Sequence, residues 1–185
     1  KQSAGFTLDG STSSKRLYRT ERSLIGDNIW FKNEYFVGAS LSGEKDHWNW
    51  KAGVFSNSRT QEFDKTFDNS FFTLTSVGYD FAESLQVDNA LLRLDFVYQD
   101  EPSAGRDLQY VGTAMHEHVA SLSFQYDDGK RHLHTDLAYA KSYDGNKLFE
   151  FQIMPFYDIN DTFPIAASYT HIESSKRANI SITKY

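Results

Sequence analysis

The sequence contains no cysteine, only three prolines and no long apolar run. Without cysteine the chain has neither a disulfide framework nor a thiolate metal site. A membrane-spanning helix requires about 20 consecutive, mostly apolar residues. Apolar residues make up 39% of this chain, and no segment reaches that length. We therefore exclude a helical membrane protein.

An excess of positive charge is also missing, because 19 lysines and arginines face 25 acidic residues and the net charge is -6. Binding a nucleic-acid backbone requires a basic face, so we expect no nucleic-acid partner. The first ten residues lack the pattern of a signal peptide, which predicts a chain that is mature or has lost its natural start. A length of 185 residues fits one domain over residues 1–185.

Aromatic residues, in contrast, are abundant, with 15 phenylalanines and 11 tyrosines. The main pattern is a period-two alternation of apolar and polar residues, in segments of about ten residues separated by turn residues. It predicts an all-β fold, an antiparallel transmembrane β-barrel of the outer-membrane porin type. The expected strands cover residues 35–42, 47–56, 71–81, 90–98, 120–126, 133–139, 149–157, 163–170 and 178–185, with residues 4–10 as a further possibility.

The alternation also predicts which side chains share a face, because successive residues of a strand point to opposite sides. Trp48 and Trp50 oppose Lys51, and Leu94 and Phe96 oppose neighbours such as Arg93. In the same way, Leu122, Leu137 and Phe151 lie opposite serine, histidine, aspartate and glutamine residues. For residues 71–81 the facing is ambiguous.

Two further features favour a membrane barrel. Many aromatic residues fall near the ends of the expected strands, where the aromatic girdles of a barrel lie. They are Trp48, Tyr79, Tyr98, Tyr126, Tyr139, Tyr157 and Tyr169. Short connections are expected around residues 43–46, 127–130 and 158–161, and long ones at 57–69 and 100–114, so that short and long connections alternate along the chain. Such barrels have tight turns at one end and longer loops at the other.

Four cations, Lys15, Arg16, Arg19 and Arg22, cluster in an irregular segment and are candidate anion-binding residues. Guanidinium groups bind phosphate or carboxylate oxygens in a bidentate manner, and rings of arginine and lysine give pores an anion preference. Lys51 and Arg93, on polar strand faces, are expected to extend this pore-lining field. The alternative is that the cluster consists of solvated loop charges, partly offset by Glu21.

Other chemistry has weaker support in the sequence. His116 and His118 are expected to point to the same side of a strand, and the spacing supplies no third metal ligand. His134 with Asp136 and Ser121 has the composition of a hydrolase triad, but no neighbouring residues mark a nucleophile or an oxyanion hole. We therefore expect no enzyme, no metal and no cofactor.

Several segments resemble the phosphate- and polyphosphate-selective outer-membrane porin family. They are Thr12–Lys15, Glu21–Leu24, Trp50–Ser56, Met154–Tyr157 and Ala167–Thr170. The resemblance implies a sixteen-stranded barrel, trimeric in the outer membrane of a Gram-negative bacterium, with an arginine- and lysine-lined constriction that selects anions. This chain would supply only part of such a barrel, from its middle and later strands.

The expected function is therefore a porin: passive diffusion of small solutes, such as phosphate and other anions, through a water-filled channel. Its expected partners are these solutes, outer-membrane lipid and two further copies in a homotrimer. An alternative is a soluble all-β carbohydrate-binding module, in which the alternation buries one face and aromatic residues form a sugar platform. A third hypothesis is a barrel enzyme of the outer membrane.

Overall fold

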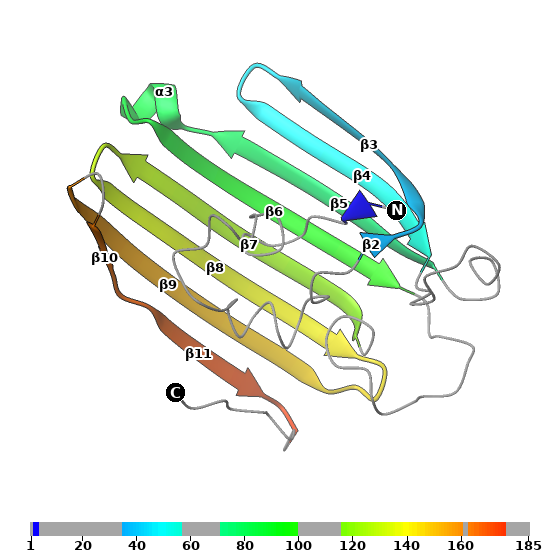
Figure 1. Cartoon of the computed structure of the whole chain (residues 1–185). Helices are drawn as coiled ribbons and strands as arrows, with labels where there is room; N and C mark the ends of the chain where they lie inside the picture. Colours follow the sequence, from blue (N-terminus) through cyan, green and yellow to red (C-terminus); the bar gives the residue numbers. More distant parts are fainter. Residues whose placement is uncertain (1, 4–34, 57–70, 100–115, 161–162, 177–185) are drawn as a thin grey trace.

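The structure, a computed structural model, describes residues 2–3, 35–56, 71–99, 116–160 and 163–176. In these ranges the chain forms one large antiparallel β-sheet, a separate two-stranded sheet and a single short helix (Figure 1). The elements are β1 (Gln2–Ser3), β2 (Tyr35–Phe36), β3 (Gly38–Lys45), β4 (Trp48–Ser56), β5 (Phe71–Asp80), α3 (Ala82–Leu85), β6 (Asn89–Gln99), β7 (His116–Asp128), β8 (Arg131–Ser142), β9 (Lys147–Asn160), β10 (Phe163–Ala166) and β11 (Tyr169–Ser174). No helix in the described part of the chain is long and apolar enough to cross a membrane.

The sheet has nine strands, and from β3 to β10 each strand pairs with the next one in sequence. β11 also pairs with β9. Ile165 of β10 lies opposite Tyr157, and Tyr169 of β11 lies opposite Ile153, so both strands keep the same register and form two parts of one edge strand. The predicted all-β antiparallel fold is confirmed. Within the described ranges, no ladder joins β3 to β10 or β11.

The two ends of the sheet differ in their connections. The β3–β4 and β7–β8 hairpins have tight turns with positive φ at Asp46 (55°) and Gly129 (57°), as two-residue hairpin turns require. These turns lie at the same end as α3, at the upper left in Figure 1. Residues 57–70 and 100–115 join strands at the opposite end, together with the shorter β8–β9 turn. The two long connections thus lie at one end, as predicted, but the β8–β9 turn at that end is shorter than the connection through α3 at the other. We call the two ends the turn end and the loop end.

One predicted turn is shorter than the sequence suggests. β3 continues through Gly43 and Glu44, which were expected to lie in a connection. Gly43 pairs with Trp50 across the ladder, and a Cβ atom on Gly43 would lie 2.7 Å from the Trp50 ring. The glycine therefore gives the indole room on the strand instead of forming a turn. The expected strands at residues 4–10 and 178–185 lie outside the described residues.

The sheet has one exposed and one buried face, which we call the outer and inner faces. Trp48 and Trp50 are exposed on the outer face, as the alternation predicts, and Lys51 lies on the inner face. β5, whose facing was ambiguous, turns Phe72 and Leu74 inward. Its outer face carries Phe71 and Val77 as well as two threonines, so apolar residues on both faces obscure the alternation.

The prediction that His116 and His118 point to the same side is wrong. The ladder between β7 and β8 shifts register between these residues, so His116 lies opposite Ser142 and His118 lies opposite Lys141. Such a β-bulge adds one residue to a strand and reverses the facing beyond it. His116 is consequently buried on the inner face, whereas His118 packs beside Tyr98 on the outer face.

An apolar cluster fills the inner face at the loop end. It consists of Phe55, Phe72, Leu74, Val97, Val119, Ala138, Ala140 and Leu148. The rings of Phe55 and Phe72 are stacked, with their centroids 5.1 Å apart. Both rings are fully buried, so this pair joins β4 to β5 through apolar contact as well as through the backbone ladder.

Phe72→Ala is expected to lower the free energy of unfolding by about 3–5 kcal/mol, because it leaves a cavity in this cluster. Phe71→Ala is the matched control, since Phe71 is the preceding residue and its ring is exposed on the outer face. Urea unfolding of the folded chain, followed by tryptophan fluorescence, measures both. Equal losses from the two substitutions would contradict the assignment of the faces.

Candidate functional site

Polar side chains form two adjacent rows across the inner face, in the middle of the strands. The ladder registers align the first row through Ser42, Lys51, Ser76, Asp95, Ser121 and Glu150, and the second through Asn49, Arg93, Ser123, Asp136 and Gln152. We call these residues the polar belt. Gly78 and Ala138 complete the rows. The belt is the candidate functional site, because it brings chemically active groups from β3 to β9 together on one face.

The centre of the belt is an ion pair between Arg93 and Asp95. The guanidinium Nε of Arg93 donates to the two carboxylate oxygens of Asp95 at 2.9 and 3.1 Å, and the hydroxyl of Ser76 donates to the same carboxylate. Asp95 is 0% exposed. Buried carboxylates require a partner of this kind. Lys51 lies directly opposite Ser76, so both cations that the sequence placed on polar faces belong to the belt.

The β8 and β9 side of the belt is acidic. Asp136 accepts a hydrogen bond of 2.6 Å from the hydroxyl of Ser121, and Glu150 is fully buried. Of the hypothetical triad, Ser121 donates directly to Asp136, and the rings of His134 and Phe156 pack in a T-shaped arrangement. The charged residues of the belt are thus three carboxylates and two cations. They are Asp95, Asp136, Glu150, Lys51 and Arg93. The remaining candidates, Lys15, Arg16, Arg19 and Arg22, lie outside the described residues.

A second polar group, at the turn end of the inner face, was not predicted. His132 contacts Asp127 through Nδ1 at 2.7 Å and Asp158 through Nε2 at 3.1 Å. Asn89 donates to the other oxygen of Asp127 at 2.8 Å. The imidazole lies parallel to the ring of Phe156, with the centroids 4.4 Å apart. This chain of contacts joins β6, β7, β8 and β9, and we call it the histidine clamp.

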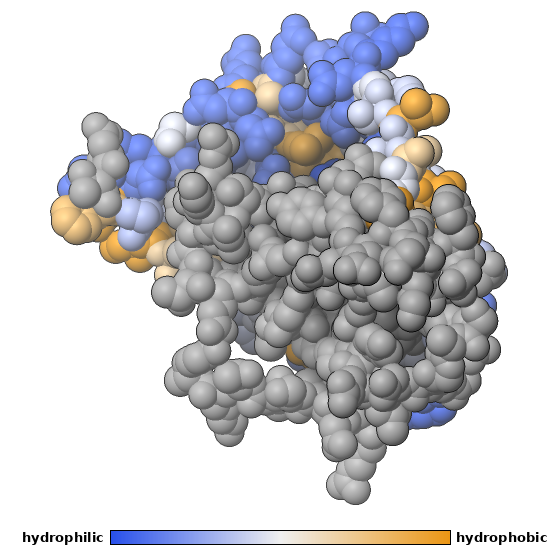
Figure 2. Space-filling view, turned by 45° about the vertical axis from the view of Figure 1, so that its right-hand side comes forward, coloured by the Kyte–Doolittle hydropathy of each residue, from blue (hydrophilic) through white to orange (hydrophobic). Residues whose placement is uncertain are grey.

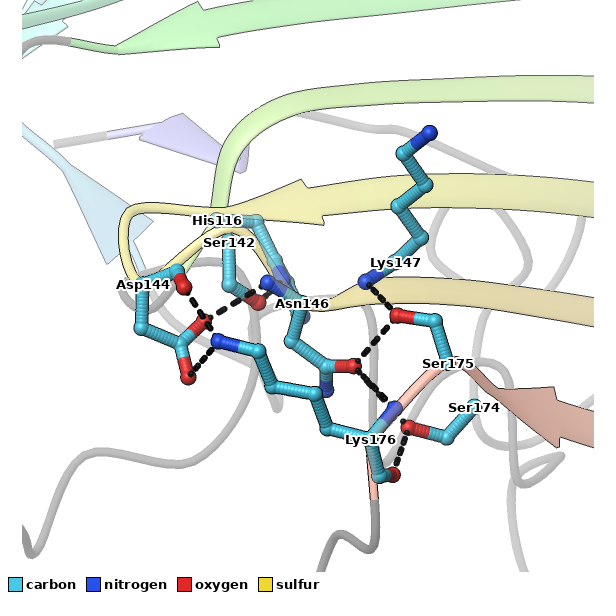
Figure 3. A network of polar contacts seen from close by, with 8 residues as sticks. All are labelled: His116, Ser142, Asp144, Asn146, Lys147, Ser174, Ser175 and Lys176. Atoms are coloured by element: carbon cyan, nitrogen blue, oxygen red, sulfur yellow. Dashed lines mark hydrogen bonds and ion pairs between the residues drawn. The ribbon is translucent and has the colours of Figure 1, made fainter.

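A third polar group ties the edge strand to the loop end of the sheet (Figure 3). The side-chain oxygen of Asn146, in the β8–β9 turn, accepts hydrogen bonds from the Ser174 and Ser175 hydroxyls and from the Lys176 amide at 3.0 to 3.2 Å. The Lys176 ammonium also pairs with Asp144 at 3.6 Å. These contacts fix the position at which β11 ends against β9. The polar atoms of the group bond to one another, so a structural role accounts for the group and no ligand has to be invoked.

The histidines near the loop end do not form a metal centre. His116 Nδ1 lies 2.9 Å from the Ser142 hydroxyl, and His118 pairs with Glu117 at 3.1 Å on the opposite face. The carboxylate of Glu117 also accepts from Lys141 at 2.8 Å. In the ranges that the structure describes, no group of three or more histidine, aspartate or glutamate residues is arranged to hold a metal.

Comparison of the chain with family models, with curated proteins and with solved structures finds no match. The resemblance to phosphate-selective porins therefore stays a prediction.

Asp95→Asn is expected to lower the free energy of unfolding by about 3–5 kcal/mol, because it removes the fully buried carboxylate that pairs with the half-buried Arg93 guanidinium. Asp128→Asn is the control, since Asp128 is an exposed residue beside a turn and its loss should change stability by no more than about 0.5 kcal/mol. Chemical unfolding of the three proteins tests this. An Asp95→Asn protein as stable as the control would show that the belt needs no internal charge pairing.

Proposed function

We propose that this chain is part of an outer-membrane β-barrel porin, through which small solutes diffuse passively without a chemical step. One observation carries the proposal: the polarity of the sheet is the reverse of that in a soluble protein. Large apolar side chains are exposed on the outer face of the strands, among them Leu41, Trp50, Val54, Leu94, Phe96, Leu122, Leu137 and Phe149. Charged and hydroxyl groups instead occupy the middle of the inner face, next to the apolar cluster. Water disfavours such a large apolar surface, whereas lipid favours it.

The lengths of the strands support the same proposal. A tilted transmembrane strand needs about 9–11 residues to cross the hydrocarbon core of a bilayer. β4, β5 and β6 have 9, 10 and 11 residues, and β7, β8 and β9 have 13, 12 and 14. These six strands are long enough to span the core, and the longer ones extend beyond it.

The ends of the outer face also fit a membrane. Trp48 packs edge-on against Tyr79 at the turn end, with centroids 4.8 Å apart, and Tyr79 packs against Phe81. Tyr98 lies at the loop end of β6. Aromatic residues of this kind occupy the two membrane interfaces in barrels. Figure 2 shows hydrophilic surface gathered at the top of the molecule, where Figure 1 has α3 and the β3–β4 turn.

The outer face of the edge strand is different. His171 and Glu173 of β11 pair with Phe151 and Phe149 and are exposed on this outer face, where a charged group is costly in lipid. This edge is better suited to contact with protein than with acyl chains. The homotrimer that the resemblance implies would offer such a contact, and we include it in the proposal.

The proposed solutes are small and polar, with anions such as phosphate as the expected class. Lys51 and Arg93 are the pore-lining cations of the described belt, but Asp95 neutralises Arg93. An anion preference would therefore depend mainly on Lys15, Arg16, Arg19 and Arg22. A barrel that also contains acidic residues selects small solutes mainly by size, and its charges modulate how readily each solute passes.

Planar-bilayer recording in a salt gradient tests the channel and its selectivity. We expect stepwise openings with an anion-biased reversal potential, reduced in conductance when phosphate is added. Arg19→Glu should move the reversal potential toward cations, and Lys130→Glu, in an exposed turn, should leave it unchanged. An absence of channels, together with solubility in water without detergent, would favour the carbohydrate-binding module instead.

Leu122→Arg tests the lipid-facing surface independently of conductance. Leu122 lies at the middle of β7 on the outer face, where an arginine in a bilayer should lower folding stability by about 2–4 kcal/mol. On the surface of a soluble protein the same change should cost no more than about 0.5 kcal/mol. Urea-dependent folding into lipid vesicles measures the difference, with Leu122→Met as the volume-matched control.

A further inference from the structure

The histidine clamp lies at the turn end of the inner face, beyond the polar belt. His132 is the second residue of β8 and lies directly opposite Asp127 of β7. On the other side it faces Phe156 of β9, and Asp158 follows two residues later. The His132 side chain is 12% exposed, whereas the two aspartates are 27% and 34% exposed. Water therefore reaches the carboxylates more readily than the imidazole.

The proton count of this arrangement is determined by its geometry. An ionised carboxylate can only accept hydrogen bonds, and a neutral imidazole has a single N–H to donate. Both ring nitrogens of His132 lie within hydrogen-bonding distance of a carboxylate oxygen, at 2.7 and 3.1 Å. Both contacts are hydrogen bonds when the ring carries two protons. A neutral ring would instead point a nitrogen lone pair at one of the carboxylates.

From this geometry we infer that His132 is a pH-sensitive clamp, which joins β7 to β9 across β8 as an imidazolium and loses one of its two links on deprotonation. The inference does not rest on the proposed function, because it concerns contacts at the turn end of the sheet whether or not the outer face meets lipid. It also extends to β6, since Asn89 holds the other oxygen of Asp127 and orients the carboxylate.

The surroundings are consistent with a ring that keeps its proton. Burial lowers the pKa of His132, but the hydrogen bonds and charges of Asp127 and Asp158 raise it more, so that the net shift is upward. The other titratable and charged groups near the clamp are Asp88, Asp128, Lys130, Arg131 and His134. Asp88 accepts from the amide of Gly129, and Asp128 accepts from the hydroxyl of Tyr126. Neither of these carboxylates is the acceptor for His132.

The direction of the pH effect follows from linkage. Because the folded chain holds the His132 proton more tightly than the unfolded chain, the stabilising contribution is complete below about pH 6.5, the ordinary pKa of histidine. It is lost as the pH rises through the higher folded pKa. The turn-end hydrogen bonds between β8 and β9 should then open more often, while the loop end stays unchanged.

The test is an NMR titration of the histidine rings in the full chain, folded in detergent micelles. His132→Gln identifies the signal, because that signal alone disappears. We expect a His132 midpoint above about 6.5, and we expect Asp127→Asn and Asp158→Asn each to weaken proton binding roughly tenfold or more. Asp128→Asn is the matched control and should leave the midpoint unchanged.

A midpoint at or below the ordinary histidine value in the unsubstituted chain would overturn the inference, even if an aspartate variant does not fold. A midpoint that neither Asp→Asn variant moves would overturn it as well. A second readout is the melting temperature against pH. The unsubstituted chain should lose stability as His132 deprotonates, and His132→Gln should remove that part of the pH dependence.

Discussion

The continuous antiparallel register from β3 to β9 is the constraint on which the rest of the structure depends. In a ladder, residues directly opposite each other share a face, so the facing of one strand determines the facing of its neighbours. Trp50 is opposite Val77, which is opposite Leu94, then Leu122, Leu137 and Phe151. A slip of one residue anywhere would bring charged groups to the apolar surface. The apolar outer face and the polar belt are therefore two consequences of one register.

The register also explains how the inner face holds charge. Arg93 and Asp95 are two residues apart on β6, so they point to the same side, and Ser76 reaches the carboxylate from the next strand. Likewise, Ser121 and Asp136 meet across β7 and β8. The buried carboxylates of Asp95 and Asp136 thus obtain these partners from their own strand or an adjacent one. The apolar cluster lies beside these groups, toward the loop end.

Much of the sheet could be predicted because the alternation is a local property of the sequence. Trp48, Trp50 and Lys51 reveal their faces within one strand, and the same holds for Arg93 among its apolar neighbours. The facing of β5 could not be predicted, because Phe72 and Leu74 face the apolar cluster while its threonines face outward. The bulge at Glu117 could not be predicted either, because a single extra residue in a strand does not change the composition.

The candidate site was predictable only in part, for a similar reason. Lys51 and Arg93 could be placed on a polar face, but not the ion pair with Asp95, which also needs Ser76 from another strand. The clamp depends on His132 meeting Asp158, a residue 26 positions away, and a contact at that distance requires the register of β8 and β9. Pairs of aspartate and histidine at opposed ladder positions would have been the signal to look for.

The central claim is that the outer face of this sheet contacts lipid, and spin-label accessibility along β6 tests it most directly. Labels placed singly at positions 93 to 98 of the chain, reconstituted in vesicles, report contact with oxygen dissolved in the bilayer and with a water-soluble nickel complex. We expect the oxygen accessibility to alternate with a period of two residues. It should be high at Leu94, Phe96 and Tyr98 and low at Arg93, Asp95 and Val97 between them. Strong nickel accessibility at Leu94 and Phe96, with no preference for oxygen, would mean that this face meets water, and would contradict the account.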